Sequence, residues 1–160
     1  MVTLKRISLK NIWELMRLKV REDQEAFVAS NPESVLEAFA AREDGAVALP
    51  IGIYDGQTPV GFVMFGYGEL PGQENPTVAK GNYCIWRFMI CAEQQGKGYA
   101  KAGMQAALEY LQTFPCGPAE YCWLSYEPEN VAARTLYHRF GFEENGEIDE
   151  EEIVAVRSLR

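Results

Sequence analysis

The stretch from Tyr83 to Thr113 decides the fold, and it reads YCIWRFMICAEQQGKGYAKAGMQAALEYLQT. Its first part, Tyr83–Cys91, is rich in β-branched and aromatic residues, which predicts a buried strand. A glycine turn follows from Gln95 to Ala100, and apolar residues then recur at helical spacing as far as Leu111. Free backbone amides and the positive end of the helix dipole at such a helix start favour a phosphate. The stretch therefore predicts a strand, a turn and a helix around a phosphate site.

The length and composition of the chain set limits on its class. Its 160 residues favour one domain, residues 1–160, with a single core. A run of about 18 apolar residues, which a transmembrane helix needs, is missing. The segment MVTLKRISLKN lacks the apolar region of a signal peptide. We therefore expect a cytoplasmic protein that does not bind a membrane.

The charge and the cysteines narrow the possible partners further. A formal net charge of −8 argues against nucleic acid and is compatible with a cationic small substrate. Composition alone favours the simpler interpretation that the acidic residues keep the protein soluble. The cysteines lack the spacing of zinc ligands, and the chain has one histidine, so we expect free thiols and no metal site. The four cysteines are Cys84, Cys91, Cys116 and Cys122.

Hydrophobic periodicity and turn residues predict the other elements. A helix should begin at Asn31 or Pro32, with Ser30 or Asn31 as its cap, and end near Asp44-Gly45. Its buried face should carry Val35, Leu36, Phe39 and Ala40. Before it we expect an edge strand at Met1–Ser8 and a helix at Asn11–Val20. After it we expect strands at Ala46–Tyr54, with Pro50 at an edge or bulge, and at Val60–Tyr67.

The C-terminal part should add a strand, a helix and a closing pair of strands. The strand is Glu120–Tyr126, and Pro128 to Asn130 open a helix that Gly141 ends. That helix should contain Val131, Ala132, Leu136, Tyr137 and Phe140, and the closing strands are Phe142–Gly146 and Glu152–Leu159. The order is strand, helix, helix, strand, strand, strand, helix, strand, helix, strand, strand. It predicts an α/β or α+β sheet with helices on its faces, unlike the alternating pattern of a doubly wound dinucleotide fold.

Three kinds of phosphate site compete for the glycine turn. The string G-x-x-x-x-G-K-[ST] of a P-loop is absent from the chain. Gly96 and Gly98 supply two glycines of the dinucleotide fingerprint G-x-G-x-x-G, and Glu120 follows at a suitable distance, but Lys101 stands at the third glycine. The third kind of site depends on a family resemblance, which two strings of the chain carry.

Two strings resemble the signatures of the Gcn5-related N-acetyltransferases (GNAT). Gln95-Gly96-Lys97-Gly98-Tyr99-Ala100 resembles their Gln/Arg-x-x-Gly-x-Gly/Ala turn, and residues 130–142 resemble their Asn-x-x-Ala-x-x-Leu-Tyr…Gly-Phe segment. The resemblance implies a GNAT fold: a mixed, mostly antiparallel sheet of six to seven strands with about four helices. It also implies that the strand ending at Ile90 splays from the strand at Glu120–Tyr126.

The resemblance implies roles for individual residues. Tyr137 would protonate the departing thiolate, although a Tyr at this spacing is by itself more often a packed core residue. Asn130 would bond the pantetheine or its neighbouring backbone, with Arg134 on the same helix face, while His138 should face solvent or the sheet edge. Acetyl-CoA, the co-substrate, would also contact the turn and the end of the strand. These contacts are Phe88, Met89, Ile90, Gln95, Gly96, Lys97, Gly98, Tyr99, Ala100 and Lys101.

A finer resemblance connects the chain to the bacterial spermine/spermidine acetyltransferase branch. It lies in EDQEAFVASNPESVLEAF, VGFVMFGY, YCIWRFMI with QGKGYAKA, and FGFEENGEIDEEEIVAVRSL. It implies a polyamine acceptor and a homodimer. The residues proposed to hold the amine are Glu22, Asp23, Glu25, Glu33, Glu69 and Trp86, each of which could also be an ordinary surface residue. Acetylation of another amine (an amino acid, an antibiotic or a protein N-terminus) and a non-catalytic acyl-CoA sensor are the alternatives. The sequence does not identify the general base.

Overall fold

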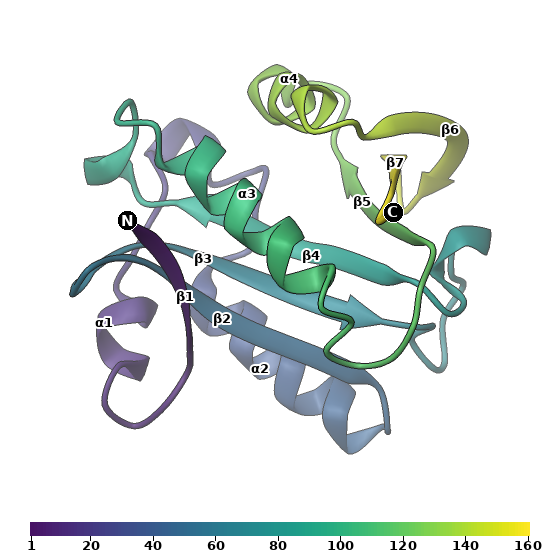
Figure 1. Cartoon of the computed structure of the whole chain (residues 1–160), viewed down its shortest axis with the longest axis horizontal. Helices are drawn as coiled ribbons and strands as arrows, with labels where there is room; N and C mark the ends of the chain where they lie inside the picture. Colours follow the sequence, from purple (N-terminus) through teal and green to yellow (C-terminus); the bar gives the residue numbers. More distant parts are fainter.

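A computed structural model describes all residues of the chain, Met1–Arg160. Its centre is a seven-stranded sheet in the order β1-β2-β3-β4-β5-β7-β6 (Figure 1). Only β4 and β5 run parallel, and every other neighbouring pair is antiparallel. The predicted mixed, mostly antiparallel sheet is confirmed. The strands are β1 (Val2–Arg6), β2 (Val47–Asp55), β3 (Thr58–Tyr67), β4 (Tyr83–Ile90), β5 (Tyr121–Tyr126), β6 (Glu143–Asp149) and β7 (Glu152–Ser158).

Helices cover both faces of this sheet. Figure 1 shows α3 crossing one face of the β1–β4 half and α2 on the opposite face, with α4 beside the β5–β7 end. The larger core lies between the sheet and α3, and Tyr137 and Phe140 of α4 pack against it. A smaller core joins α2 to Phe62 and Met64 of β3. The predicted order of elements is confirmed, and none of the helices has the length and apolarity that a membrane crossing requires. The helices are α1 (Ile12–Met16), α2 (Asn31–Glu43), α3 (Tyr99–Leu111) and α4 (Val131–Arg139).

The first two helices begin and end for local reasons. The backbone N–H of Glu33 donates to Oγ of Ser30 at 3.2 Å, so Ser30 is the cap of α2 among the two predicted residues. The predicted helix Asn11–Val20 is too long, because α1 ends at Met16. The buried side chain of Asn31 donates to the carbonyl of Leu15 at 2.9 Å, and this bond satisfies a carbonyl that a longer helix would have used.

The predicted buried face of α2 is partly wrong, because Leu36, Phe39 and Ala40 are exposed. Leu36 and Phe39 are 70% and 65% exposed, whereas the small Ser34 and Ala38 are buried against the sheet. Small side chains let the helix approach the strands closely, which decides the face more strongly than the apolar pattern does. Val131, at the first position of α4, is 65% exposed.

The parallel pair opens at the centre of the sheet. β4 and β5 are paired only at Tyr83 with Cys122 and at Cys84 with Trp123. Beyond these two positions the strands separate, so the predicted splay is confirmed. Pro50 also occupies the predicted kind of position, because β1 pairs with β2 only from Ile51 onward and leaves the edge open at Pro50. All four cysteines are free.

Candidate active site

A cavity of about 1320 Å³ lies at the opening between β4 and β5. Its wall comes from the segment before α2, the first part of α2, the loop after β3, β4, the glycine turn, β5, α4 and the β6–β7 hairpin. Pockets for one drug-sized ligand usually enclose about 300–1,000 Å³. The cavity therefore has room for two substrates that meet at the splayed strands.

The glycine turn presents free backbone donors to this cavity. Gly98 caps α3 in the left-handed region at φ 87°, and Gly96 has φ 78°. The first amide of the helix that donates within the chain is that of Ala102, which bonds the Gly98 carbonyl at 3.1 Å. The preceding amides are free at the positive end of a 13-residue helix. This arrangement fits a pyrophosphate.

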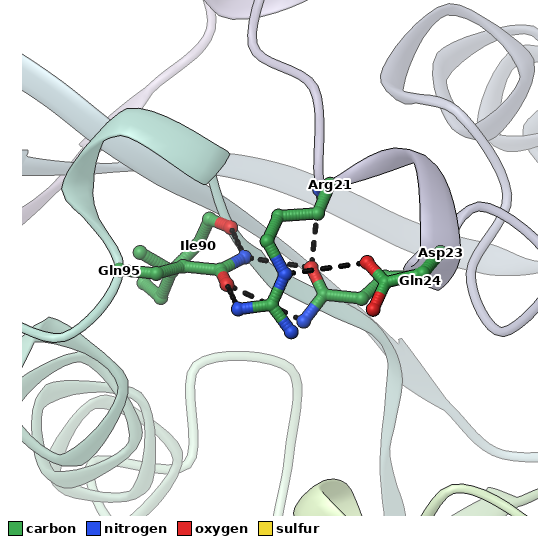
Figure 2. Close-up of polar contacts among 5 residues, drawn as sticks. All are labelled: Arg21, Asp23, Gln24, Ile90 and Gln95. Atoms are coloured by element: carbon green, nitrogen blue, oxygen red, sulfur yellow. Dashed lines mark hydrogen bonds and ion pairs between the residues drawn. The ribbon is translucent and has the colours of Figure 1, made fainter.

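The side chain of Gln95 connects the turn to the segment before α2 (Figure 2). Its Nε2 donates to Oε1 of Gln24 at 2.8 Å and to the carbonyl of Ile90 at 2.9 Å. Its Oε1 accepts from the guanidinium of Arg21 at 3.0 Å, and Arg21 also pairs with Asp23 at 3.2 Å. The side chain of Gln95 therefore holds the turn by bonds to other residues of the protein. Only the backbone of Gln95 is left for the predicted contact with the cofactor.

Two other side chains of the turn point elsewhere. Nζ of Lys97 donates to Oε1 of Gln94 at 3.1 Å, and Lys97 does not line the cavity. The hydroxyl of Tyr99 donates to Oδ2 of Asp55 at 2.5 Å. That bond raises the pKa of Tyr99 and lowers the pKa of Asp55. The predicted phosphate contact of Lys97 is not supported by its position, whereas Lys101 does line the cavity.

The open edge of β4 supplies further donors. The amide of Cys91 donates to the carbonyl of Val60 at 2.9 Å, which directs the amide and carbonyl of Ile90 away from β3. Because these directions alternate along a strand, the amide of Phe88 also faces the opening, whereas that of Met89 faces β3. The amides of Phe88 and Ile90 therefore have the direction that the predicted contact with acetyl-CoA requires. Met89 also lines the cavity, but its amide faces β3 and is not available for that contact.

Tyr137 lines the cavity from α4. Burial is the main cause that raises its pKa, and the negative charge of Glu152 adds to the effect. Its ring packs against those of Tyr126, at 5.8 Å between centroids, and Phe142, at 6.1 Å. The phenol thus stays protonated over the whole neutral range and can donate a proton.

The other predicted residues of α4 have different positions. Oδ1 of Asn130 accepts from the amide of Ala133 at 3.3 Å, so Asn130 caps the helix, and it also lines the cavity. Arg134 does not line the cavity. It pairs with Glu144 of β6 at 2.8 Å, which corrects its predicted place at the cofactor. His138 is exposed, as expected.

The predicted acceptor residues divide into two groups. Glu25, Glu33 and Trp86 line the cavity, whereas Glu22 and Glu69 are exposed and do not. Glu22 begins a short 3-10 turn, Glu22–Gln24, from which it faces solvent. Asp23 is also absent from the wall, because it pairs with an arginine of the same segment.

Sequence reasoning did not identify several charged residues of the wall. Arg87 of β4 pairs with Glu37 of α2 at 2.7 Å, and its guanidinium lies 5.8 Å from the ring centre of Trp86. An arginine within the apolar string YCIWRFMI was the signal that could have revealed this pair. Other acidic residues of the wall are Glu74, Glu127, Asp149, Glu150 and Glu152.

Residues 12–142 match the acetyltransferase (GNAT) family. The match covers most of the chain, so the chain belongs to this family. Membership confirms the predicted class of enzyme, an N-acetyltransferase with acetyl-CoA as its co-substrate.

Individual relatives agree with this assignment. The chain is 29% identical to the spermine/spermidine N(1)-acetyltransferase of Bacillus subtilis (strain 168) over 149 residues, which are 92% of this chain and 91% of that protein. An aminoglycoside acetyltransferase, AAC(6')-Ib, in complex with coenzyme A has a TM-score of 0.77 at 20% identity, covering 99% of this chain and 95% of that one. The spermidine N-acetyltransferase from Vibrio cholerae, in complex with CoA and spermine, has a TM-score of 0.67 at 20% identity and the same coverage. The two structures establish the fold, and the Bacillus relative agrees with the resemblance to the polyamine branch.

Proposed function

We propose that this enzyme transfers the acetyl group of acetyl-CoA to a primary amine of a polyamine such as spermine or spermidine. The observation that carries the proposal is the charge of the cavity wall. Its acidic residues outnumber its basic ones, and one of the basic ones, Arg87, already pairs with Glu37. The acidic residues are Glu25, Glu33, Glu37, Glu74, Glu127, Asp149, Glu150 and Glu152, and the basic ones are Lys19, Arg21, Arg87, Lys101 and Arg139.

None of the basic residues of the wall lies on α2 or on the β6–β7 hairpin, where most of the acidic residues lie. Arg21 and Lys101 lie at the glycine turn, where they add positive charge near the pyrophosphate. Glu25 lies on the segment before α2, five others lie on α2 and on the β6–β7 hairpin, and Glu74 and Glu127 lie on the loops after β3 and β5. A polycationic acceptor would be attracted to that acidic part. The name of the Bacillus relative supports the same class of acceptor.

The residues of the site divide the catalytic work. Backbone amides of the turn and the dipole of α3 hold the pyrophosphate, and acetyl-CoA supplies the acyl group as a thioester. The amides of Phe88 and Ile90 bind at the thioester end, where they stabilise the negative charge that develops on its oxygen. Tyr137 gives a proton to the leaving sulfur. A thiol with a pKa of about 8.5 already leaves readily, so we expect positioning to contribute more than this proton.

The proposal is tested with a panel of acceptors under steady-state conditions. We expect kcat/KM to increase with the number of ammonium groups, from butylamine through putrescine and spermidine to spermine. We also expect the preference for spermine to decrease in added salt, which screens charges. Equal kcat/KM for butylamine and spermine would contradict a polyamine acceptor. A preference for kanamycin or for a peptide N-terminus would favour the alternative amines, and tight CoA binding without turnover on any amine would favour a sensor.

We include a cytoplasmic homodimer in this proposal. Trp13 of α1 and Leu36 and Phe39 of α2 are 66%, 70% and 65% exposed, and a second copy of the chain would cover such side chains. Sedimentation velocity of the wild type and of Phe39→Glu tests this part. A monomeric wild type would contradict it.

A further inference from the structure

Two carboxyl groups of the cavity wall have their pKa raised above the ordinary value, and both belong to the β6–β7 hairpin. They are Asp149 and Glu152, which are paired with each other across the hairpin. Glu152 is also fixed by the neighbouring strand, because the hydroxyl of Ser125 donates to its Oε1 at 2.7 Å. This bond holds the carboxylate in one orientation and occupies only one of its two oxygens.

Glu152 lies on the sheet face opposite α4. Ser125 pairs with Val154, and Glu152 is two residues before Val154, so the three side chains share one face. On that face Val154 packs against Trp123 in a small cluster apart from the main core. Tyr137 packs on the other face. Since Glu152 and Tyr137 both line the cavity, they approach the splayed strands from opposite sides.

The charges around Glu152 suit a proton acceptor. Burial is the largest effect on its pKa and raises it, and the negative charges of Glu127 and Asp149 raise it further. The hydrogen bond from Ser125 and the positive charge of Arg87 act in the opposite direction. An efficient general base has a pKa that is raised toward the working pH, because it then binds a proton more strongly while remaining ionised.

We propose that Glu152, held by Ser125, is the general base that takes the proton from the reacting ammonium group of the acceptor. This inference rests on the acetylation of a primary amine. The ammonium transfers one proton to Glu152 and becomes a neutral amine, whose nitrogen then forms a bond to the thioester carbon. When the carbon–sulfur bond breaks, Tyr137 gives its proton to the sulfur, and the second proton lost by the nitrogen returns Tyr137 to its neutral form. Glu152 then releases its proton to water, so each turnover yields the amide, free CoA and one proton.

The pH dependence of Glu152→Gln tests this role. An alkylammonium with a pKa of about 10.4 is almost entirely charged at pH 7. A variant without the base depends on the small neutral fraction, so its kcat/KM should increase about tenfold per pH unit between pH 7 and 9. The wild type should vary little over this range. At pH 7 we expect a loss of roughly 100-fold, at the low end of general-base effects.

Three controls separate the base from other roles. Glu152→Gln keeps the oxygen that accepts from Ser125, so its melting temperature and acetyl-CoA KM should remain those of the wild type. Glu151→Gln removes the same charge one residue away, at an exposed position outside the cavity, and should keep the wild-type profile. Ser125→Ala removes a bond that lowers the pKa of Glu152. In this variant the decrease of kcat/KM on the acid side should therefore begin at a higher pH than in the wild type.

The outcomes decide the proposal on any amine that the enzyme accepts. A wild-type profile for Glu152→Gln, or a loss by the same factor at every pH, overturns the role as base. A wild type that acetylates amines other than polyamines refutes only the proposed acceptor, and the variants then decide the base with that amine. A wild type that acetylates no amine overturns both.

Discussion

Gly98 allows the phosphate site to be tested with a matched control in the same chain. Gly98 and Gly146 both have φ 87°, and a Cβ added at either position would meet no atom of the protein within 4 Å. Gly98 caps α3 at the cavity, whereas Gly146 lies on β6 and outside the cavity wall. Substitution by alanine should therefore affect the backbone equally at the two positions and affect ligand binding at only one.

The size of each effect follows from this geometry. The left-handed conformation costs alanine about 1–2 kcal/mol. The smaller freedom of alanine in the unfolded chain offsets about 0.4–1 kcal/mol of this cost. The net loss of about 1 kcal/mol corresponds to a decrease of roughly 2–4 °C in the melting temperature of either variant. A methyl group that displaces one amide–phosphate hydrogen bond at Gly98 should cost a further 1.5–3 kcal/mol or so of binding energy, which is about 10- to 100-fold in Kd.

Calorimetry measures both quantities on the same samples. Differential scanning calorimetry should show similar melting temperatures for Gly98→Ala and Gly146→Ala. Isothermal titration with CoA should show weaker binding for Gly98→Ala alone, and Gly98→Glu should abolish binding because it adds a like charge. Equal CoA affinity in the two alanine variants and the wild type would refute the assignment of the turn to the pyrophosphate.

Two further substitutions test the parts of the site that surround the thioester and the turn. Tyr137→Phe should lower kcat by about tenfold or more and change the acetyl-CoA KM little, because it removes a proton donor and keeps the packed ring. A variant with the kcat of the wild type in steady-state assays would exclude Tyr137 as the acid. Gln24→Leu removes the partner of Gln95, so it should raise the acetyl-CoA KM severalfold and lower the melting temperature by a few degrees. If both values stayed unchanged, the Gln24–Gln95 contact would have no part in holding the turn.

The elements that the sequence predicted well depend on local signals. Strand β4, the turn and α3 form one continuous stretch in which residue type, glycine positions and helical spacing agree. The backbone donors of the turn follow from the start of a helix, which the sequence reveals directly. Ser30 and Asn130 likewise act within three residues of their own positions, as helix caps. Such features need no knowledge of how distant segments pack.

The features that the sequence did not predict depend on contacts between distant residues. Gln24 meets Gln95 across 71 positions, Glu37 meets Arg87 across 50, and Ser125 meets Glu152 across 27. Charge and spacing alone do not show which of many glutamates reach the cavity, so the sequence predicts Glu22 at the acceptor and does not single out Glu152. The exposure of Phe39 was not predicted for the same reason. Close packing of small residues, rather than apolarity, determined the buried face of α2.

We propose that the turn and the splayed strands hold acetyl-CoA for transfer to a polyamine nitrogen. Mass spectrometry of spermine after incubation with acetyl-CoA and the enzyme tests this claim most directly. We predict that the wild type forms acetylated spermine and releases an equal amount of CoA, and that Gly98→Glu forms none. Free CoA without acetylated spermine, or unchanged product formation by Gly98→Glu, would contradict the account.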